Sequence, residues 1–308
     1  MKIAILSFED LSSRTPKEEL RLVQASRELG HTARIFRVDK CQLIYDQNNP
    51  SVFYDGKIFP KYDVLIPRAM ILRNVELQVA IVKQFQLMGM PVVNTFHAIA
   101  RAKNKLRTMQ ILDHYGIPIP KTVVVRDPKY INNDILKQIN GPPVILKTPF
   151  GSYGNGVVIA ESKRAIMSAT GFLLKQSKLN MILLQEYMKE SRGKDVRVFV
   201  VGNKVVGAMV RSAVKGEFRS NIELGGRGEK THLSKHEISV AIEAAKALKL
   251  EVAGVDIIRS SKGPLVLEVN ANPGFKMLEE VTGLDIAKSI IEYAVKKAAK
   301  YKQEKEEA

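Results

Sequence analysis

The segment that most restricts the fold is the strand–turn–strand pattern AGVDIIRSSKGPLVLEVNANPG, from residue 253 to residue 274. VDII and LVLEVN are apolar runs, and SSKGP between them has the composition of a turn. Asp256 interrupts the first run and Glu268 the second. Glu268 and Asn270 stand two residues apart on one strand, so their side chains share a face. The pattern predicts two paired strands whose polar oxygens converge.

These oxygens favour a metal site. A carboxylate within an apolar strand carries a large free-energy cost unless it has a partner. Two carboxylates and an amide oxygen are hard ligands, which suit Mg²⁺ bridging nucleotide phosphates better than zinc. An ion pair between Glu268 and one of the many lysines is the alternative that this segment alone leaves open.

Size and charge narrow the class of protein. A chain of 308 residues is too long for one ordinary core, so two or three domains are expected. The single cysteine, Cys41, fits a reducing cytosol, and no apolar run approaches a membrane span. We therefore expect a cytoplasmic protein without a membrane partner. The net charge of +16 indicates an anionic partner, which could be nucleic acid, acidic lipid, nucleotide or an acidic substrate.

The first hundred residues alternate between strand and helix patterns, which predicts a small parallel sheet covered by helices. The expected strands are 2–6, 33–38, 62–66 and 91–94, and the expected helices are 17–29 and 74–88. Gly30 and Gly89 are the expected helix stops.

Beyond residue 100 the chain continues with mixed patterns. One long helix is expected from Ala98 to Tyr115 and another over 128–139. Strands are expected over 143–147, 157–162 and 182–188, followed by a hairpin that turns at Gly202-Asn203. Ser234 and Glu237 match a capping box that opens a helix to Leu250. We expect an N-terminal α/β domain over 1–100, a central lobe over 101–187 and a C-terminal lobe over 188–308.

The glycine-rich segment GSYGNG, residues 151–156, lies between two expected strands. This context fits neither a P-loop nor a Rossmann fingerprint. A hairpin that closes over phosphates with backbone N–H groups is the interpretation we favour, and a plain turn is the alternative. Lys147 ends the preceding strand and is well placed as a point charge for phosphates. Lys105 could be a second such charge or a surface lysine.

Two further segments carry candidate binding groups. Glu186 lies where a strand gives way to a connector, so its backbone could meet an adenine edge. Asp195 could hold ribose hydroxyls. The segment FRSNIELGGRGE brings Arg219, Asn221 and Arg227 together. The planar guanidinium of arginine suits a γ-phosphate or a developing acyl phosphate, although a loop with solvated charges would have the same composition.

Taken in order, these motifs resemble those of ATP-grasp carboxylate–amine ligases, and most closely those of the RimK family, which adds glutamate to the C-terminus of a small-subunit ribosomal protein. The resemblance covers essentially the whole chain. It rests on MKIAILS, DVLIPR, ARAKNKLRTMQIL, PVILK, GSYGNGVV, QEYM, DVRVFVVG, EFRSN…GGRG, AGVDIIR and LEVNANPG. Glutathione synthetases share much of the later part. The stretch FEDLSSRTPKEE departs from the RimK pattern. Because the resemblance implies that this domain helps to hold the acceptor, the identity of the acceptor is left open.

The resemblance implies an α/β protein in which a parallel-sheet domain precedes a two-lobed ATP-grasp fold, with nucleotide held between the lobes. It also implies a role for each matching residue. Lys105, Lys147 and Gly154 would contact phosphates, Glu186 and Tyr187 adenine, and Asp195 ribose; Arg219, Ser220 and Asn221 would line the phosphate and acyl site, with Arg219 and Asn221 as catalytic residues; Asp256, Glu268 and Asn270 would bind Mg²⁺ or Mn²⁺, as two ions.

We therefore expect an ATP-dependent ligase that forms an acyl phosphate and adds L-glutamate to an acidic protein C-terminus, and we expect it to be a homo-oligomer. The same chemistry on a small molecule or a carrier protein is one alternative. A basic nucleic-acid- or ribosome-binding protein without catalysis is another, but carboxylates at 256 and 268 would repel phosphate unless a metal were present.

Overall fold

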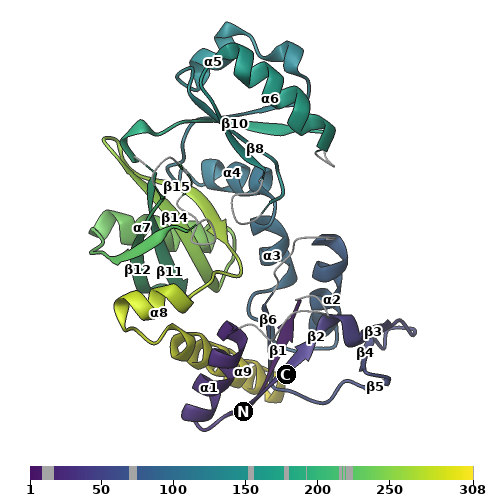
Figure 1. Ribbon diagram of the computed structural model, residues 1–308. Coiled ribbons are helices and arrows are strands. Elements are labelled where there is room, and N and C mark those ends of the chain that lie inside the picture. Colours follow the sequence, from purple (N-terminus) through teal and green to yellow (C-terminus); the bar gives the residue numbers. More distant parts are fainter. Residues whose placement is uncertain are drawn as a thin grey trace.

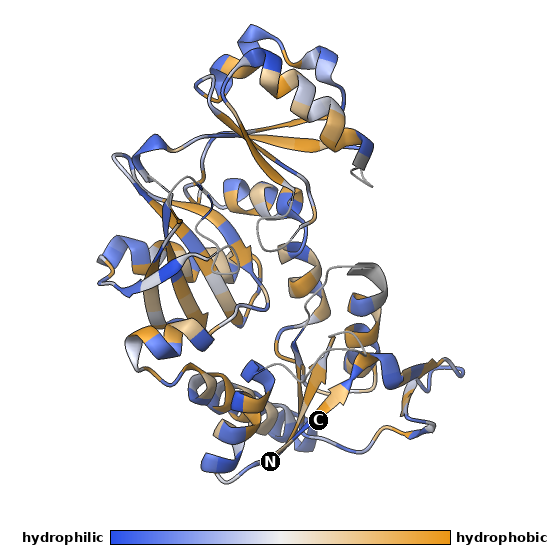
Figure 2. Ribbon diagram, viewed as in Figure 1, coloured by the Kyte–Doolittle hydropathy of each residue, from blue (hydrophilic) through white to orange (hydrophobic). Residues whose placement is uncertain are grey.

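The computed structural model describes residues 1–8, 17–68, 75–151, 156–176, 180–191, 193–214, 217, 219 and 225–307. Within these residues the strands form four sheets. Figure 1 shows the parallel N-terminal sheet at the bottom, the small central lobe at the top and the largest sheet on the left. Most of the longer strands in the three bodies are coloured as hydrophobic in Figure 2, because their residues fill the cores.

The N-terminal body contains the expected parallel sheet, with strand order β2-β1-β6. Its elements are β1 (Lys2–Ser7), α1 (Lys17–Glu28), β2 (Thr32–Arg37), β6 (Val64–Arg68) and α2 (Val75–Leu87). The fourth expected strand is reduced to one bridge between Leu65 and Val92. Just after this bridge, the side chain of Asn94 bonds to the C-terminal sheet, as described below.

A second sheet of short strands accompanies it and was not expected from the sequence. It consists of β3 (Cys41–Ile44), β4 (Ser51–Tyr54) and β5 (Lys57–Ile58). These strands are short and half exposed, so they lack the apolar alternation that a prediction needs. Short 3₁₀ turns occupy Val38–Lys40, Pro128–Tyr130 and Lys189–Ser191.

The prediction of one long helix from Ala98 to Tyr115 was wrong. The structure has two helices in this segment, α3 (Phe96–Ala102) and α4 (Lys105–His114). Asn104 separates them. Its backbone is extended, and its side-chain oxygen accepts hydrogen bonds from the N–H groups of Leu106 and Arg107. An Asn that caps a new helix competes with continuation of the old one. Because α4 starts anew after this break, its first residue, Lys105, lies beside Glu268 at the candidate site.

The central lobe is a four-stranded antiparallel sheet with order β7-β10-β8-β9. Its elements are β7 (Thr122–Val125), α5 (Asn133–Gln138), β8 (Val144–Lys147), β9 (Val157–Ala160), α6 (Lys163–Gln176) and β10 (Ile182–Glu186). The helix expected over 128–139 is instead a 3₁₀ turn followed by the short α5. Asp127 and Asn132 each cap a separate segment, which divides the expected helix.

The C-terminal sheet has five antiparallel strands in the order β13-β12-β11-β14-β15. Its elements are β11 (Lys194–Val201), β12 (Lys204–Ser212), β13 (Arg227–Lys230), α7 (Lys235–Ala247), β14 (Val252–Ser260), β15 (Gly263–Asn270), α8 (Lys276–Thr282) and α9 (Ile286–Glu306). The capping box of Ser234 and Glu237 is confirmed. Gly202 forms the expected hairpin turn with φ of 61°.

The last helix returns to the beginning of the chain. α9 packs against α1 and β6, and Figure 1 shows it beside the N-terminal sheet. Ile3 and Leu22 share one buried cluster with Ile286 and Ile290. The N-terminal and C-terminal segments therefore complete a common core. The two domain boundaries drawn from the sequence stay predictions.

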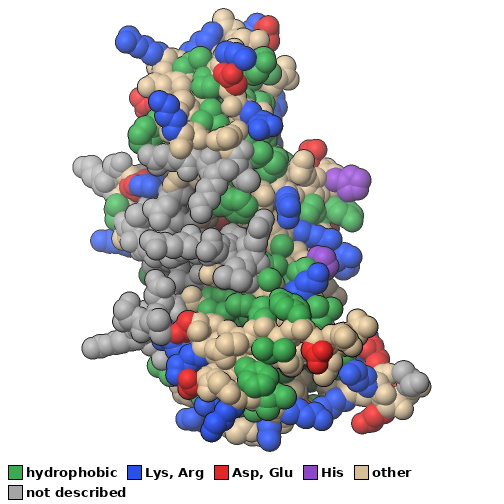
Figure 3. Space-filling view, turned by 90° about the vertical axis from the view of Figure 1, so that its right-hand side faces the viewer, with side chains coloured by type: hydrophobic (Ala, Val, Ile, Leu, Met, Phe, Trp, Pro, Cys, Tyr) green, Lys and Arg blue, Asp and Glu red, His purple; other side chains and the backbone are tan. Residues whose placement is uncertain are grey.

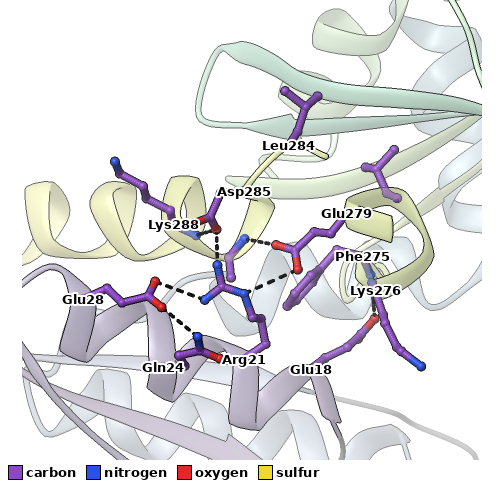
Figure 4. Close-up of polar contacts among 12 residues, drawn as sticks. Glu18, Arg21, Gln24, Glu28, Phe275, Lys276, Glu279, Leu284, Asp285 and Lys288 are labelled. Carbon is purple, nitrogen blue, oxygen red and sulfur yellow. Dashed lines mark hydrogen bonds and ion pairs between the residues drawn. The ribbon is translucent and has the colours of Figure 1, made fainter. Parts of the chain in front are cut away.

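Polar contacts reinforce this junction (Figure 4). Arg21 of α1 pairs with Asp285 at 2.7 Å and Glu279 at 3.6 Å. One oxygen of Glu18 accepts from the backbone N–H of Phe275 at 2.6 Å and that of Lys276 at 3.0 Å. A carboxylate at these N–H groups satisfies donors at the start of α8. The contacts orient α8 and α9 relative to α1.

Asn94 joins the N-terminal body to the C-terminal sheet through a completely satisfied side chain. Its amide nitrogen donates to the carbonyls of Val252 at 2.7 Å and Ala271 at 2.8 Å. Its oxygen accepts from the N–H groups of Glu251 at 2.7 Å and Val252 at 2.9 Å. Asn94 is buried, so no water replaces these partners.

We expect Asn94→Ala to lower the free energy of unfolding by about 3 kcal/mol, because four buried backbone groups lose their partner. Urea unfolding monitored by circular dichroism measures this loss. Asn132→Ala is the matched control: it removes a single local cap bond and should cost about 1 kcal/mol. Equal losses in the two variants would contradict the assigned role of Asn94.

In the part of the chain that the structure describes, no helix is both long and apolar enough to span a membrane. The cytoplasmic location expected from the sequence stays a prediction.

Candidate active site

The three predicted metal ligands lie together on the last two strands. Asp256 of β14 is directly opposite Glu268 of β15, and Gly254 is opposite Asn270. The register then shifts, because Ile257 pairs with Val266, which leaves Leu267 as an extra residue on β15. Such a bulge re-aims the neighbouring side chains. β15 is the edge strand of its sheet and contacts α4, so the site opens towards the central lobe.

Asp256 is buried between two arginines. Its carboxylate accepts hydrogen bonds from both Arg197 Nε and Arg197 Nη2, and Arg211 Nη2 lies 2.9 Å from its Oδ2. Burial alone would raise the pKa of Asp256, but the charges of Arg197 and Arg211 outweigh it and hold the pKa below its usual range. Asp256 is therefore an ionised carboxylate that is fixed in position.

Glu268 is held much less tightly. Among the described residues its one ion pair within 4 Å is with Lys105, whose Nζ lies 3.7 Å from Oε1, and its side chain is 35% exposed. Asn270 Nδ2 lies 3.4 Å from Asp256 Oδ2, which orients the amide beside the carboxylate pair. The oxygens of Glu268 thus keep acceptor sites for a further ligand. The ion pair considered as the alternative exists, but it is long, at 3.7 Å, and its carboxylate is partly exposed.

The two predicted phosphate-binding lysines reach the same place from different elements. Lys105 begins α4 and donates to the carbonyl of Gly151 at 3.0 Å, besides facing Glu268. Lys147 ends β8 and donates to Gln185 Oε1 at 2.6 Å. Burial lowers the pKa of Lys147 to about 8, with Glu268 and Asp256 opposing the shift and Lys105 adding to it. The two lysines are close enough to feel each other's charge.

The glycine-rich segment joins β8 to β9, which form the expected antiparallel hairpin. Gly156 has φ of 75°, and a Cβ there would come 2.2 Å from Thr148 Oγ1, so only glycine fits. Residues 152–155, including Gly154, lie outside the described residues. The phosphate-lid interpretation stays a prediction.

The predicted nucleoside-binding residues lie at the end of β10 and on β11. Glu186 accepts from Asn140 Nδ2 at 2.5 Å, and its backbone N–H donates to the carbonyl of Lys121 at 2.9 Å. Tyr187 follows as a half-buried residue. Asp195 is buried and bonds Arg211 through both oxygens at 2.7 Å. The adenine and ribose roles of these residues stay predictions. Asp195 is linked to Asp256 through Arg211, which contacts both carboxylates.

Arg219 is bound to a neighbouring carboxylate. Its Nη2 lies 2.7 Å from Glu217 Oε2, and this hydrogen bond raises the pKa of the guanidinium. Ser220 and Asn221 lie outside the described residues, so the proposed phosphate and acyl site is represented here by Arg219 alone. The catalytic roles of Arg219 and Asn221 stay predictions.

Four side chains around the site were not singled out from the sequence. Arg197 and Arg211 neutralise Asp256, and the arginine within each apolar run, VRVFVV and AMVR, was the available signal. Lys103 lies beside Lys105, Glu268 and Arg68, and burial lowers its pKa to about 8. Arg68, which ends β6, brings the N-terminal body to this cluster and lies 3.5 Å from the carbonyl of Pro273.

The donor set fits Mg²⁺. Asp256, Glu268 and Asn270 offer two carboxylates and an amide, all oxygen ligands, on one face of a strand pair. Asn272, two residues beyond Asn270, has a buried side-chain oxygen without a hydrogen-bond partner among the described residues. Among the described residues no group of three or more His, Cys, Asp and Glu side chains could hold a metal, so a zinc-type site is not supported there.

We expect nucleotide affinity to fall as pH rises above about 8, because only protonated Lys147 attracts phosphate and its pKa is lowered to about 8. The loss approaches roughly tenfold per pH unit beyond that value if one proton is coupled to binding. Titration calorimetry with an ATP analogue and Mg²⁺ from pH 7 to pH 9.5 measures it.

The Lys147→Met variant should bind the ATP analogue more weakly, and its affinity should depend less on pH. The Lys103→Met variant tests in the same way whether Lys103, whose pKa is also about 8, contributes to the pH dependence. A wild-type profile that stays flat to pH 9.5 would show that neither lysine contributes its charge to binding.

Comparison with known proteins is consistent with this geometry. Residues 1–99 match the RimK PreATP-grasp domain and residues 102–294 match the RimK-like ATP-grasp domain. A protein of Marinomonas sp., named probable alpha-L-glutamate ligase, is 43% identical over 97% of this chain and 96% of its own length.

Two solved structures share the fold. The ATP-grasp ligase PsnB, in complex with a precursor variant, Mg and ADP, has a TM-score of 0.72 at 19% identity over 96% of this chain and 98% of its own. The D-alanine–D-alanine ligase of Bacillus anthracis, in complex with ATP, has a TM-score of 0.71 at 14% identity over 99% of both chains. The chain therefore belongs to the RimK-like ATP-grasp family and is an ATP-dependent ligase.

Proposed function

We propose that this protein joins the amino group of L-glutamate to a carboxylate at the C-terminus of a ribosomal protein or another acidic acceptor. The observation that carries the proposal is the meeting of Asp256, Glu268 and Asn270 with Lys105 and Lys147 at one edge of the C-terminal sheet. The 43% identity to a probable alpha-L-glutamate ligase supports glutamate as the amino acid.

The chemistry has two steps. An oxygen of the acceptor carboxylate attacks the γ-phosphorus of ATP, the bond to the bridging oxygen breaks, and ADP leaves with an acyl phosphate formed. The glutamate nitrogen then attacks the acyl carbon, phosphate leaves with the C–O electron pair, and the nitrogen loses a proton. Lys105, Lys147 and Arg219 stabilise the negative charge on the phosphates, since fixed cations need no reorganisation during the reaction.

Asp256, Glu268 and Asn270 would hold Mg²⁺, or Mn²⁺, as two ions. Bound there, the metal supplies charge neutralisation for the phosphates of ATP. The two arginines that fix Asp256 prevent its carboxylate from turning away, which keeps the ligand set oriented. We also propose that the protein works as a homo-oligomer, which light scattering after size exclusion would test.

The proposal is tested by mass spectrometry. The protein is incubated with ATP, Mg²⁺, an acceptor peptide with an acidic C-terminus and each amino acid in turn. We expect ADP release that requires both the acceptor and glutamate, together with a peptide heavier by one or more glutamyl residues. ADP release with an amino acid other than glutamate, or without any acceptor peptide, would contradict the proposal.

A small molecule or a carrier protein is the second candidate acceptor. The fold similarity to a D-alanine–D-alanine ligase over 99% of both chains supports it, because that fold also serves small substrates. Adding glutamate to a free amino acid or a short peptide, with no reaction at a protein C-terminus, would favour this candidate. A nucleic-acid-binding role without catalysis predicts no ADP release with any acceptor.

A further inference from the structure

A hollow of about 320 Å³ lies at the junction of α3 and α4, and the sites proposed above do not use it. We call it the α3–α4 groove. Its lining residues are His97, Ala100, Arg101, Arg107, Gln110 and Ile111. In Figure 3, Lys and Arg side chains gather around histidines at the height of these two helices, with few acidic side chains among them.

The two arginines of the groove lack an anionic partner among the described residues. Elsewhere on the surface, cations meet carboxylates, as Lys276 does with Glu280 and Lys300 with Glu304. Neither Arg101 nor Arg107 has a side-chain hydrogen bond or ion pair within the described part of the chain. Two guanidinium groups that share one hollow repel each other unless an anion lies between them.

Helix electrostatics explain Arg101 but not Arg107. Arg101 lies in the last turn of α3, where a cation is favourable. Arg107 lies in the first turn of α4, which contains no acidic residue and where a cation is unfavourable. Local stability therefore gives no reason for Arg107. A bound anion would supply the missing compensation.

The groove is near the proposed active site but on the other side of α4. Lys105 and Arg107 are two residues apart in one helical turn, so their side chains point in nearly opposite directions. Lys105 faces Glu268, whereas Arg107 lines the groove. A helix is about 10 Å across, so half its circumference is about 16 Å, and an extended chain advances about 3.3 Å per residue. About five residues of peptide would reach around α4 from one side to the other.

We propose that the α3–α4 groove binds acidic side chains of the acceptor peptide, a few residues before the carboxylate that reacts. This inference rests on the proposed function. The planar guanidinium of arginine matches a carboxylate in a two-bond contact. The lining contains no Phe, Tyr or Trp, and His97 is its one ring side chain, which favours an acidic peptide over a run of stacked bases in single-stranded nucleic acid.

The test compares two charge-matched double variants. Arg101→Gln with Arg107→Gln removes both groove cations. Arg126→Gln with Lys175→Gln removes two cations from a different hollow, on the central lobe, that Arg126, Leu174, Lys175 and Asn180 line. Binding of a fluorescent oligoglutamate peptide, measured by anisotropy without ATP, gives the affinity. Steady-state assays use an acceptor with upstream glutamates and one with glutamines in their place.

We expect the groove variant to lose at least about tenfold in affinity for oligoglutamate and in kcat/KM for the acidic acceptor. Its kcat at saturation, its KM for ATP and its kcat/KM for the glutamine acceptor should match the wild type, and the control variant should change little. Equal losses in both variants, or none in the groove variant, would overturn the inference. So would a groove variant that loses affinity for an oligonucleotide but not for oligoglutamate.

The binding assay separates this inference from the proposed function. If no acceptor is ever ligated but oligoglutamate binding still depends on Arg101 and Arg107, the proposed reaction fails and the groove assignment holds. If ligation of glutamate proceeds and the groove variant binds and reacts normally, the groove assignment fails alone.

Discussion

Glu268→Gln is expected to lower ATP-dependent turnover by at least about a hundredfold while leaving the free energy of unfolding within about 0.5 kcal/mol of the wild type. The variant keeps the shape of the side chain but removes one negative ligand from the proposed metal site. Stability should hold because Glu268 is partly exposed and its described ionic contact, to Lys105, is long at 3.7 Å. Coupled detection of ADP and urea unfolding measure the two quantities.

Glu280→Gln is the matched control, since Glu280 lies on the surface of α8 and pairs only weakly with Lys276, at 3.5 Å. It should leave both quantities unchanged. Near-normal ADP production by Glu268→Gln at saturating Mg²⁺ would remove Glu268 from the proposed ligand set.

Asp256→Asn is expected to abolish turnover and also to lower the free energy of unfolding by about 3 kcal/mol. The difference from Glu268 follows from the surroundings. Asp256 is buried and bonded to Arg197 and Arg211, so the neutral side chain would leave the buried Arg211 and the half-buried Arg197 under-compensated. The predicted contrast is between one carboxylate that matters for activity alone and its neighbour that matters for activity and stability.

The pH dependence of stability gives an independent check on Asp256. Its pKa in the folded protein is held below the usual value, so its contribution is complete above the pKa of the unfolded chain and is lost as pH falls through the folded pKa. Asp256→Asn should therefore destabilise strongly at neutral pH and less in acid. Asp63→Asn, which weakens a partly exposed pair with Lys302, should cost no more than about 1 kcal/mol. Equal costs for the two variants would contradict the buried-pair account.

Local patterns in the sequence predicted most of the elements correctly. The parallel N-terminal sheet, the hairpin at Gly202 and the capping box of Ser234 follow from residues within a few positions of one another. Glu268 and Asn270 converge because side chains two residues apart on a strand share a face. The turn after Ser260 pairs the two strands so that Asp256 lies opposite Glu268. Such features depend on backbone geometry and short contacts, which the local sequence specifies.

Errors arose where one polar side chain outweighed a regular pattern. The segment from Ala98 to Tyr115 has the periodicity of a single helix, but the Asn104 side chain caps α4 and ends the continuity. The strand expected over 91–94 keeps only a bridge to Leu65, and beyond it the Asn94 side chain bonds to the C-terminal sheet. A periodicity count gives these single asparagines little weight, although each satisfies several backbone groups.

The family, the parallel N-terminal sheet and the oxygen-bearing residues of the site could be predicted from the amino-acid sequence, because they are properties of neighbouring residues and of motif order. The way in which the site is held could be seen only in the folded chain. Arg197 and Arg211 come from other strands to fix Asp256, Lys105 arrives on a helix whose start was not foreseen, and burial alters the pKa of Lys147. Charge pairing and desolvation depend on which distant segments pack together, and no local pattern carries that information.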